Sequence, residues 1–315
     1  MYTFKKLFKI IFRFLEYHIV NIPNVNIPNV KGNGSQSLVI QNGKIIQTIN
    51  GKPIWITNQV YCYGKVIDRI IEISKENSNV TIVIPYTDED PFYNNPYTLF
   101  YKKPELLHSK YKEIENKLGS NIIFFISCYY KSSPSFPNVY RLPWTDKIYE
   151  GNPTIINSKP ILTKKRGVIW RGCRSGGNKD SLRSRIVNHL KNNKYCDVQF
   201  TSVKNRLTPY QQSEYRVILM IDGNGWPGSI VWNFLSGSVV IAVSVWHTYI
   251  FDKMTPWVDY IPCKPDLSDI NEIIELVMKD NELDLQKIAN NGKRKFLKYF
   301  NATYADKIIK EAIIG

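Results

Sequence analysis

The sequence predicts an α/β protein in which parallel strands are joined by crossover helices. Apolar runs of strand length occur at residues 80–86, 122–127, 167–170, 198–201, 216–222 and 238–243. Helical patterns and loops separate these runs, and near-continuous apolar strands that alternate with helices are typical of parallel sheets covered on both faces. The chain has 315 residues, which is enough for about two domains.

Helical periodicity is clearest toward the C-terminus. Residues 268–279 place their apolar side chains on one face, with Ser268 as the expected N-cap, and further helices are predicted over 285–299 and 302–314. The proline-rich stretch 132–160 separates the two α/β regions. We therefore expect an N-terminal domain over 36–158 and a C-terminal domain over 159–300. A helix over 301–315 is expected to pack back on the first domain.

The first 35 residues have a different character. Residues 4–17 form a basic amphipathic helical pattern, and the linker after them contains the repeated sequence Asn-Ile-Pro-Asn-Val. The helix would either dock on the chain's own core or contact a membrane surface. The chain shows neither a signal-peptide cleavage pattern nor an apolar run of about 20 residues. We expect a protein that is cytoplasmic or peripheral at a membrane surface and is not secreted.

The charge favours an anionic partner. Lys and Arg number 42 and Asp and Glu 27, a net charge of +15, and nine of the cations lie within 159–185 beside a single acid, Asp180. Few aromatic residues are interleaved with this run, which makes nucleic acid an unexpected partner. The five cysteines and four histidines show no zinc spacing, and an odd, widely spaced set of cysteines favours a reducing compartment.

A glycine-rich loop follows the apolar strand over 216–222. It reads Asp222-Gly223-Asn224-Gly225-Trp226-Pro227-Gly228, and a helix is predicted from Ser229 to Ser236. Backbone N–H groups at such a strand–loop–helix junction bind phosphate, so a nucleotide is expected there. An ordinary tight turn is the alternative, because Asp-Gly and Asn-Gly are common turn sequences.

A basic loop follows the strand over 167–170. Arg171, Arg174 and Lys179 lie in it, and small residues such as Gly172 would let a ligand approach the backbone. Arginine matches two phosphate oxygens with two N–H groups, which predicts phosphate binding. The alternative is a solvated basic surface.

Carboxylates follow the strand over 80–86 directly. Asp88, Glu89 and Asp90 could supply a general base in a cleft or oxygen ligands for a divalent cation. A solvated acidic turn is the third interpretation.

Six motifs in order resemble glycosyltransferase family 90, which contains capsule-associated proteins and protein O-glucosyltransferases. They are Trp170-Arg171-Gly172, Asp222-Gly223-Asn224-Gly225-Trp226, 235–240, 256–262, 266–269 and 288–292. The resemblance covers about residues 79–300 and is strongest over 166–300. It implies a GT-B architecture, in which two Rossmann-like domains with parallel sheets face each other across a cleft.

The resemblance also implies a reaction. A UDP-sugar would donate a hexose or pentose, with inversion and without a metal or other cofactor, to a hydroxyl of a glycan or protein. The general base would be Asp88, with Asp90 as the second choice. The donor-binding residues indicated by the patterns and the resemblance are Trp170, Arg171, Gly172, Cys173, Arg174, Lys179, Asp222, Gly223, Asn224, Gly225 and Ser229.

One position departs from the family pattern. Ser229 stands where an arginine that binds the diphosphate is often found, and Arg174, Arg183 or Arg185 would have to compensate. Two alternatives therefore stay open. One is an inactive or weakened member that binds polyanions or glycans. The other is a metal-dependent transferase that uses Asp88, Glu89 and Asp90.

Overall fold

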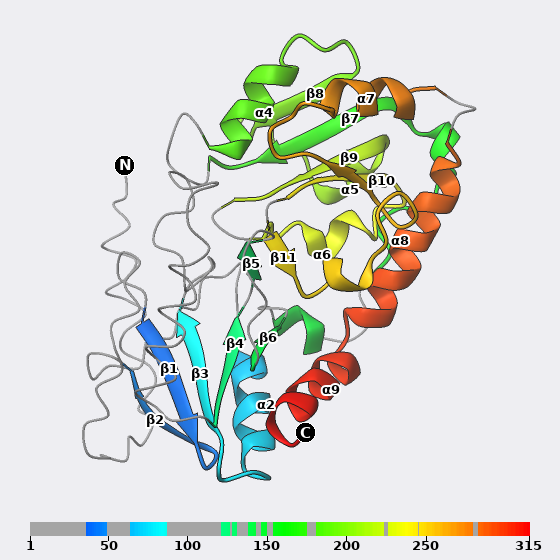
Figure 1. Cartoon of the computed structure of the whole chain (residues 1–315). Coiled ribbons are helices and arrows are strands. Elements are labelled where there is room, and N and C mark those ends of the chain that lie inside the picture. Colours follow the sequence, from blue (N-terminus) through cyan, green and yellow to red (C-terminus); the bar gives the residue numbers. More distant parts are fainter. Residues whose placement is uncertain are drawn as a thin grey trace.

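The computed structural model contains two five-stranded sheets and the helices around them (Figure 1). The structure describes residues 36–48, 64–86, 121–126, 128–130, 138–142, 146–149, 154–174, 181–223, 226–244, 246–279 and 283–315. The predictions for residues 1–35, Asp88, Asp90, Lys179, Asn224 and Gly225 lie outside the described residues.

The C-terminal sheet is entirely parallel. Its strands lie in the order β12 (Ile261–Cys263), β10 (Val239–Val243), β9 (Tyr215–Ile221), β7 (Lys165–Gly172) and β8 (Cys196–Phe200). Each neighbouring pair is parallel. The apolar runs over 167–170, 198–201, 216–222 and 238–243 are thus confirmed as strands of one parallel sheet.

Both faces of this sheet are covered, which explains why its central strands are apolar throughout. Successive side chains point to opposite faces of a strand. In β10, Val239, Ile241 and Val243 enter one apolar core, whereas Val240 and Ala242 enter another. The helices are α4 (Leu182–Leu190) and α7 (Ile270–Val277) at the first core, α6 (Ile230–Asn233) at the second, and α8 (Leu285–Tyr299), which contributes to both.

Helix ends differ from the predictions at two places. The helices over 285–299 and 302–314 are confirmed as α8 and α9 (Ala302–Ile313). Helix α7 has Asp269 as its N-cap, because the N–H of Ser268 donates to Asp266 in a turn that precedes the helix. Helix α6 is one turn long, and the predicted extent to residue 236 is wrong. The Ser236 hydroxyl donates to the carbonyl of Asn233, and the chain leaves the helix in a tight turn.

The N-terminal sheet is mixed rather than parallel. Its order is β2 (Lys44–Thr48), β1 (Gln36–Gln41), β3 (Thr81–Tyr86), β4 (Ile122–Ile126) and β6 (Val139–Arg141). The pairs β3–β4 and β4–β6 are parallel, but β1 is antiparallel to both of its neighbours. The prediction of parallel sheets missed a hairpin, which turns at Asn42 and Gly43 with both residues in the left-handed region.

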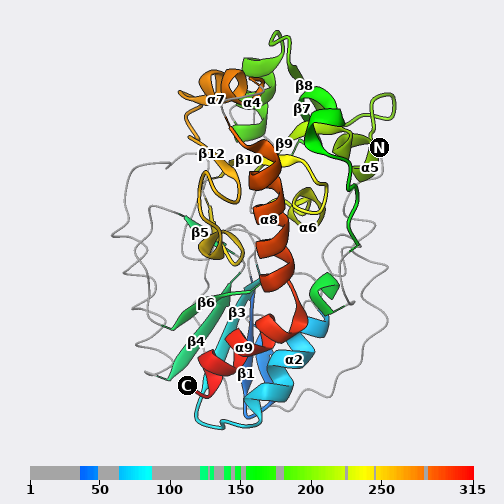
Figure 2. The ribbon, with the colours of Figure 1, turned by 90° about the vertical axis from the view of Figure 1, so that its right-hand side faces the viewer.

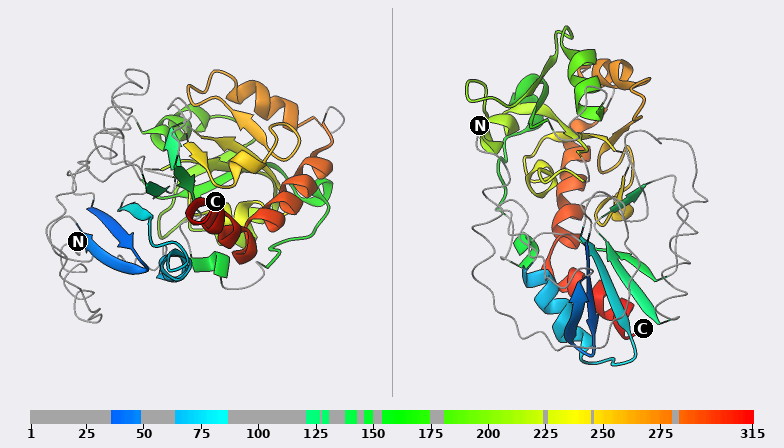
Figure 3. Two further views of the ribbon diagram at one scale, coloured as in Figure 1. Left: turned by 60° about the horizontal axis from the view of Figure 1, so that its bottom comes forward. Right: turned by 90° about the vertical axis from the view of Figure 1, so that its left-hand side faces the viewer.

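A short pair of strands lies between the two sheets, and two helices pack together beside the N-terminal sheet (Figures 1 and 3). Strand β5 (Cys128–Tyr130) pairs with β11 (Trp246–Thr248). Helix α9 packs against α2 (Gly64–Ser74), where Arg69 forms an ion pair with Asp306 at 2.8 Å. The remaining elements are α5 (Pro209–Ser213) and the short helices η1 (Asp146–Tyr149), η2 (Ile161–Thr163) and η3 (Phe251–Lys253). Within the described residues, no helix has the length and apolar composition needed to cross a bilayer.

Candidate functional site

The candidate site lies at the carboxyl ends of β9, the central strand of the parallel sheet, and its neighbour β7. Numbered along the chain, the five strands lie in the order 2-1-3-4-5. The chain therefore leaves β7 toward one edge of the sheet and β9 toward the other. A crevice forms where connections depart in opposite directions, and ligands of open α/β sheets bind there. The predicted basic loop and glycine loop begin at this point.

Arg183, in the first turn of α4, joins the two loops. Its Nη1 donates to the carbonyl of Cys173 at 3.0 Å, beyond the end of β7. Its Nε and Nη2 donate to the carbonyls of Asp222 and Ile221 at 3.1 and 3.2 Å, at the end of β9. The guanidinium also lies 5.7 Å from the centre of the Trp170 ring, and the residue is only 9% exposed. One buried cation thus sets the distance between the two loops.

This arrangement orients backbone amides. In a planar trans peptide the N–H points away from the C=O of the same peptide unit. Because the carbonyls of Cys173 and Asp222 point at Arg183, the N–H groups of Arg174 and Gly223 point away from it. The helix start is fixed as well, since the Ser181 hydroxyl accepts the N–H of Ser184 as an N-cap. A buried arginine therefore fixes the orientation of the backbone at the start of both loops.

Aromatic residues support the start of the basic loop. Trp170 is buried, and its ring meets Phe200 edge-on at 5.9 Å. The exposed Arg174 stacks its guanidinium over Phe200 at 4.4 Å, and a guanidinium bound by its face retains its N–H edge for oxygen acceptors. Position 172 requires glycine because a Cβ there would overlap the Trp170 ring. The Trp-Arg-Gly sequence is therefore explained by packing below the loop.

Arg171 has a different environment from the one predicted for a donor-binding residue. Its guanidinium forms a two-pronged ion pair with Asp197 at 2.7 and 2.8 Å. The remaining N–H groups donate to the carbonyls of Asn205, Trp170 and Asp197, so all five donors are used within the protein. The side chain is 6% exposed. Arg171 thus joins β7 to β8 and has no N–H group left for a diphosphate.

Ser229 also makes its contacts within the protein. It precedes the single turn of α6, and its hydroxyl accepts a hydrogen bond from the buried Asn233 at 3.2 Å. A helix of one turn has only a small dipole, so the predicted contribution of the helix N-terminus to anion binding is weaker than the sequence suggested.

Comparisons with known proteins show what the region around this site is similar to. Residues 157–304 match the sequence model described as Glycosyl transferase family 90. The region is family 90-like. It holds the whole parallel sheet and the Arg183 site, and it makes up just under half of the chain. The resemblance predicted from the ordered motifs is confirmed over this range.

The curated relatives include proteins named as sugar transferases. Protein O-glucosyltransferase 1 of Rattus norvegicus is 29% identical over 150 residues, which cover 43% of this chain and 37% of the rat protein. O-glucosyltransferase LpsA of Dichelobacter nodosus is 25% identical over 125 residues, covering 36% of this chain and 38% of that protein. Uncharacterized protein 035R of Invertebrate iridescent virus 3 is 28% identical over 130 residues, 40% of this chain and 11% of the viral protein. The chain thus matches less than two fifths of the length of each relative.

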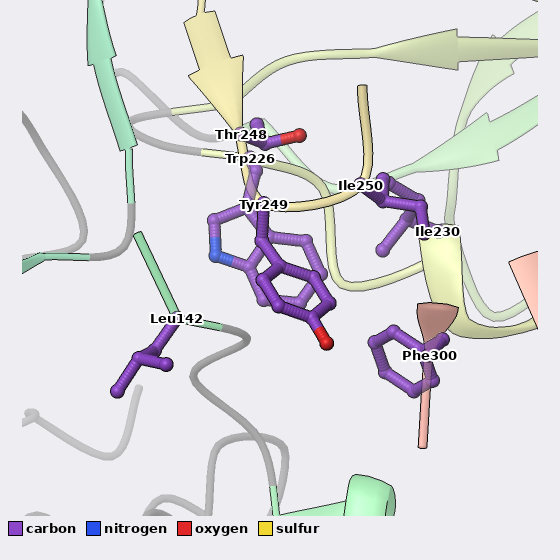
Figure 4. A pocket seen from close by; sticks show the side chains of 7 residues that line it. All are labelled: Leu142, Trp226, Ile230, Thr248, Tyr249, Ile250 and Phe300. Atoms are coloured by element: carbon purple, nitrogen blue, oxygen red, sulfur yellow. The ribbon is translucent and has the colours of Figure 1, made fainter. Parts of the chain in front are cut away.

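A small pocket lies where the family 90-like region meets Leu142 of the N-terminal half (Figure 4). Its other lining residues are Trp226, Ile230, Thr248, Tyr249, Ile250 and Phe300. Trp226 belongs to the glycine loop, so the pocket adjoins the candidate site along the chain. The Tyr249 hydroxyl donates to the carbonyl of Tyr299 at 2.5 Å, and burial raises the pKa of Tyr249 well above its usual range. The pocket is therefore apolar, with a neutral phenol on its wall.

The structure brings together part of the predicted donor site. Trp170, Gly172, Cys173, Arg174, Asp222 and Gly223 lie around Arg183, which the sequence indicated only as one of three arginines that could compensate for Ser229. The one sequence signal for Arg183 is its place in the first turn after the N-cap Ser181, at the end of the basic loop. Asp88, Asp90, Lys179, Asn224 and Gly225 stay predictions. Within the described part of the chain, no cluster of three His, Cys, Asp or Glu side chains could hold a metal ion.

Proposed function

We propose that this chain is a glycosyltransferase that moves a hexose or pentose from a UDP-linked donor to a hydroxyl of a glycan or protein. One observation carries the proposal. A single buried guanidinium, that of Arg183, binds the carbonyls of both loops at the switch point of a parallel sheet, within the family 90-like region. Two relatives are named O-glucosyltransferases, so glucose is the first sugar to test.

The donor diphosphate would bind beyond the ends of β7 and β9. The backbone N–H and the guanidinium of Arg174 would donate to its oxygens, with Lys179 from the same loop. Charge-assisted hydrogen bonds stabilise the negative charge that develops as the diphosphate departs. These cations would take the place of a metal ion, and Arg174 would compensate for the serine at position 229.

The acceptor would be activated from the N-terminal half, across the cleft of a GT-B arrangement. Asp88 would take the proton of the acceptor hydroxyl while that oxygen forms a bond to the anomeric carbon. The bond from the anomeric carbon to the diphosphate oxygen breaks on the opposite face, and the electron pair leaves with UDP. The configuration at the anomeric carbon inverts, through a transition state that resembles an oxocarbenium ion.

The test incubates the purified full chain with UDP-glucose, UDP-galactose, UDP-xylose and GDP-mannose, and measures the nucleotide released with and without a chelator. We expect one UDP-sugar to be consumed at a rate that the chelator leaves unchanged. Loss of turnover with the chelator would favour the metal-dependent alternative. Absence of both donor binding and donor consumption, together with binding to acidic glycans, would favour the binding module.

A further inference from the structure

A rigid loop presents two apolar side chains to solvent on the side of the molecule away from the candidate site. It covers residues 255–260, between η3 and β12, and Trp257 and Val258 at its tip are 43% and 46% exposed. Trp257 has a φ of 64°, in the left-handed region that non-glycine residues rarely adopt. Because β12 starts directly after this loop and runs parallel to β10, the loop lies at the amino edge of the sheet.

Hydrogen bonds within the loop hold this conformation. The N–H of Thr255 donates to the Asp259 carboxylate, and the N–H of Trp257 donates to the carbonyl of Tyr260, both at 2.7 Å. The N–H of Asp259 donates back to the carbonyl of Thr255 at 2.9 Å. A left-handed tryptophan costs free energy, so the surrounding contacts must impose it. The exposed tip is therefore a fixed feature of the fold.

Helix α8 fixes the loop from the side (Figure 2). The Asn291 side chain donates to the carbonyl of Val258 at 3.1 Å. Lys295 forms an ion pair at 2.8 Å with Asp259, whose side chain is only 1% exposed. Gly292 lies against the carbonyl of Asp259, where a Cβ would overlap it. These contacts place the tip directly beside the surface of α8.

The neighbouring surface of α8 is basic. Lys287, Arg294 and Lys298 are exposed, and their spacings of seven and four residues place them on one face of the helix. Asn291, which binds the loop, lies within this stripe, and α8 contains no acidic residue. The carboxylate at its start, Asp284, is used as the N-cap and accepts the N–H of Lys287 at 2.9 Å. Three exposed cations thus lie beside an exposed tryptophan and valine.

We propose that this face, made of Trp257, Val258, Lys287, Arg294 and Lys298, binds the surface of an anionic lipid bilayer. Tryptophan is favoured at the membrane–water interface, and basic side chains are attracted to anionic headgroups. A soluble polyanion would use the cations but leave the apolar tip without a function. The loop that carries the apolar tip lies at the amino edge of the sheet, whereas the candidate site lies at the carboxyl edge. The proposal is independent of residues 4–17 and of the proposed activity.

The test measures sedimentation of the full chain with vesicles of phosphatidylcholine, with and without phosphatidylglycerol. We expect binding only to the anionic vesicles, weakened by salt. Neutralising the α8 cations should lower the affinity by about fivefold for each cation removed. The variant is K287Q/R294Q/K298Q, and its control with the same change in charge at exposed positions elsewhere is K191Q/K204Q/R206Q. Equal losses in both triple variants would overturn the proposal, because general attraction would then account for binding.

A second measurement tests the apolar tip. Asparagine tolerates the left-handed backbone conformation of position 257, so Trp257→Asn should preserve the loop. The double variant Trp257→Asn/Val258→Ser should lower vesicle affinity by about tenfold. Val203→Ser, at a fully exposed valine outside the face, should have no effect. Lipids brominated near the headgroup should quench the tryptophan fluorescence of the bound wild type more than that of bound Trp257→Phe. This comparison is informative even where both proteins bind the vesicles equally well. Equal quenching would overturn the proposal. So would loss of binding to a soluble acidic polysaccharide in these variants while vesicle binding is unchanged.

Discussion

Arg183 donates its Nε–H to the carbonyl of Asp222 at 3.1 Å, and this bond fixes the first turn of α4 to the end of β9. The same guanidinium reaches Cys173 beyond β7, so the two loops cannot separate without breaking bonds to a buried charge. Breaking these bonds would leave a buried positive charge without acceptors, which is costly, so this geometry is stable. The spacing of the two loops is therefore set by a buried side chain beneath them.

Replacing this guanidinium should affect both stability and donor binding. In Arg183→Gln, three carbonyl groups lose a charged donor, and we expect the free energy of unfolding to fall by about 3–5 kcal/mol. Because the loops would no longer be aligned, donor affinity should fall by about tenfold or more in the protein that remains folded. Urea unfolding and calorimetric titration with UDP measure the two effects.

Arg185→Gln is the matched control for that variant. Arg185 lies on the same helix, and its Nη2 donates to the carbonyl of Pro265 at 3.0 Å. Among the described residues of the loops at β7 and β9 it has no hydrogen-bond partner, so UDP affinity should change by less than about threefold. If Arg183→Gln binds UDP as well as Arg185→Gln does, Arg183 is not a positioning residue.

Arg171 should be a stability residue and not a donor ligand. In Arg171→Gln, Asp197 loses a two-pronged ion pair and β7 loses a tie to β8, so unfolding should become easier by about 2–4 kcal/mol. UDP affinity, measured below the unfolding transition, should stay within about threefold of the wild type. A large loss of UDP affinity with unchanged stability would instead support the donor-binding role that the resemblance implies.

The packing of Gly172 on Trp170 can be tested by a double-mutant cycle. Gly172→Ala adds a methyl group that would overlap the six-membered part of the indole, and it should destabilise the protein by about 1–3 kcal/mol. Trp170→Phe removes those ring atoms. In the Trp170→Phe background the additional cost of Gly172→Ala should therefore be smaller by about 1 kcal/mol. Additive effects in thermal unfolding would contradict this explanation of the glycine.

The sequence was sufficient to predict the elements with strong periodicity. Buried strands such as β9 and β10 are apolar throughout because both faces are covered, and α8 has a regular apolar face, so both kinds of element are recognisable in a single sequence. Strand β11 has three residues and pairs with β5, which is more than 100 residues away in the chain. No local pattern encodes such a pairing, so it was not predicted.

The sequence predicted that the two loops lie at the same edge of the sheet, but it did not predict the contacts of their individual side chains. Residue type and spacing placed Arg171 and Arg174 together in a basic loop. Strand geometry separates them, because Arg171 is the last residue but one of β7 and its side chain meets Asp197 of β8, whereas Arg174 lies beyond the strand on Phe200. Arg183 is nine residues further along, and its role depends on where α4 packs. Tertiary contacts of this kind cannot be deduced from composition.

Lys164 should make stability rise with pH. The side chain is 4% exposed, and its Nζ donates to the carbonyl of Ser236 at 2.7 Å. Burial lowers the pKa of Lys164 from 10.5 to about 8. Between these values the unfolded chain binds the proton more tightly than the folded protein. The free energy of unfolding should therefore increase from pH 8 toward pH 10.5, by about 3 kcal/mol in total.

Comparison with Lys164→Met isolates this effect from other groups that titrate in the same range. Burial raises the pKa of Cys196 to about 12, which would lower stability as pH rises, but it does so equally in both proteins. The difference in unfolding free energy between wild type and Lys164→Met should therefore grow in favour of the wild type from pH 8 to pH 10. A difference that is constant with pH would contradict the assignment.

Asp88→Asn separates catalysis from donor binding. If Asp88 takes the acceptor proton, the amide cannot do so, and turnover should fall by about 10²–10⁴-fold while UDP affinity stays within about threefold. Asp90→Asn is the control, because it removes a neighbouring carboxylate of the same segment, and its turnover should stay within about tenfold of the wild type. If Asp90→Asn is the inactive variant, the base is Asp90. Near-normal turnover in both variants would exclude this segment as the source of the base, and equal loss in both with restoration by added divalent cation would favour a metal site.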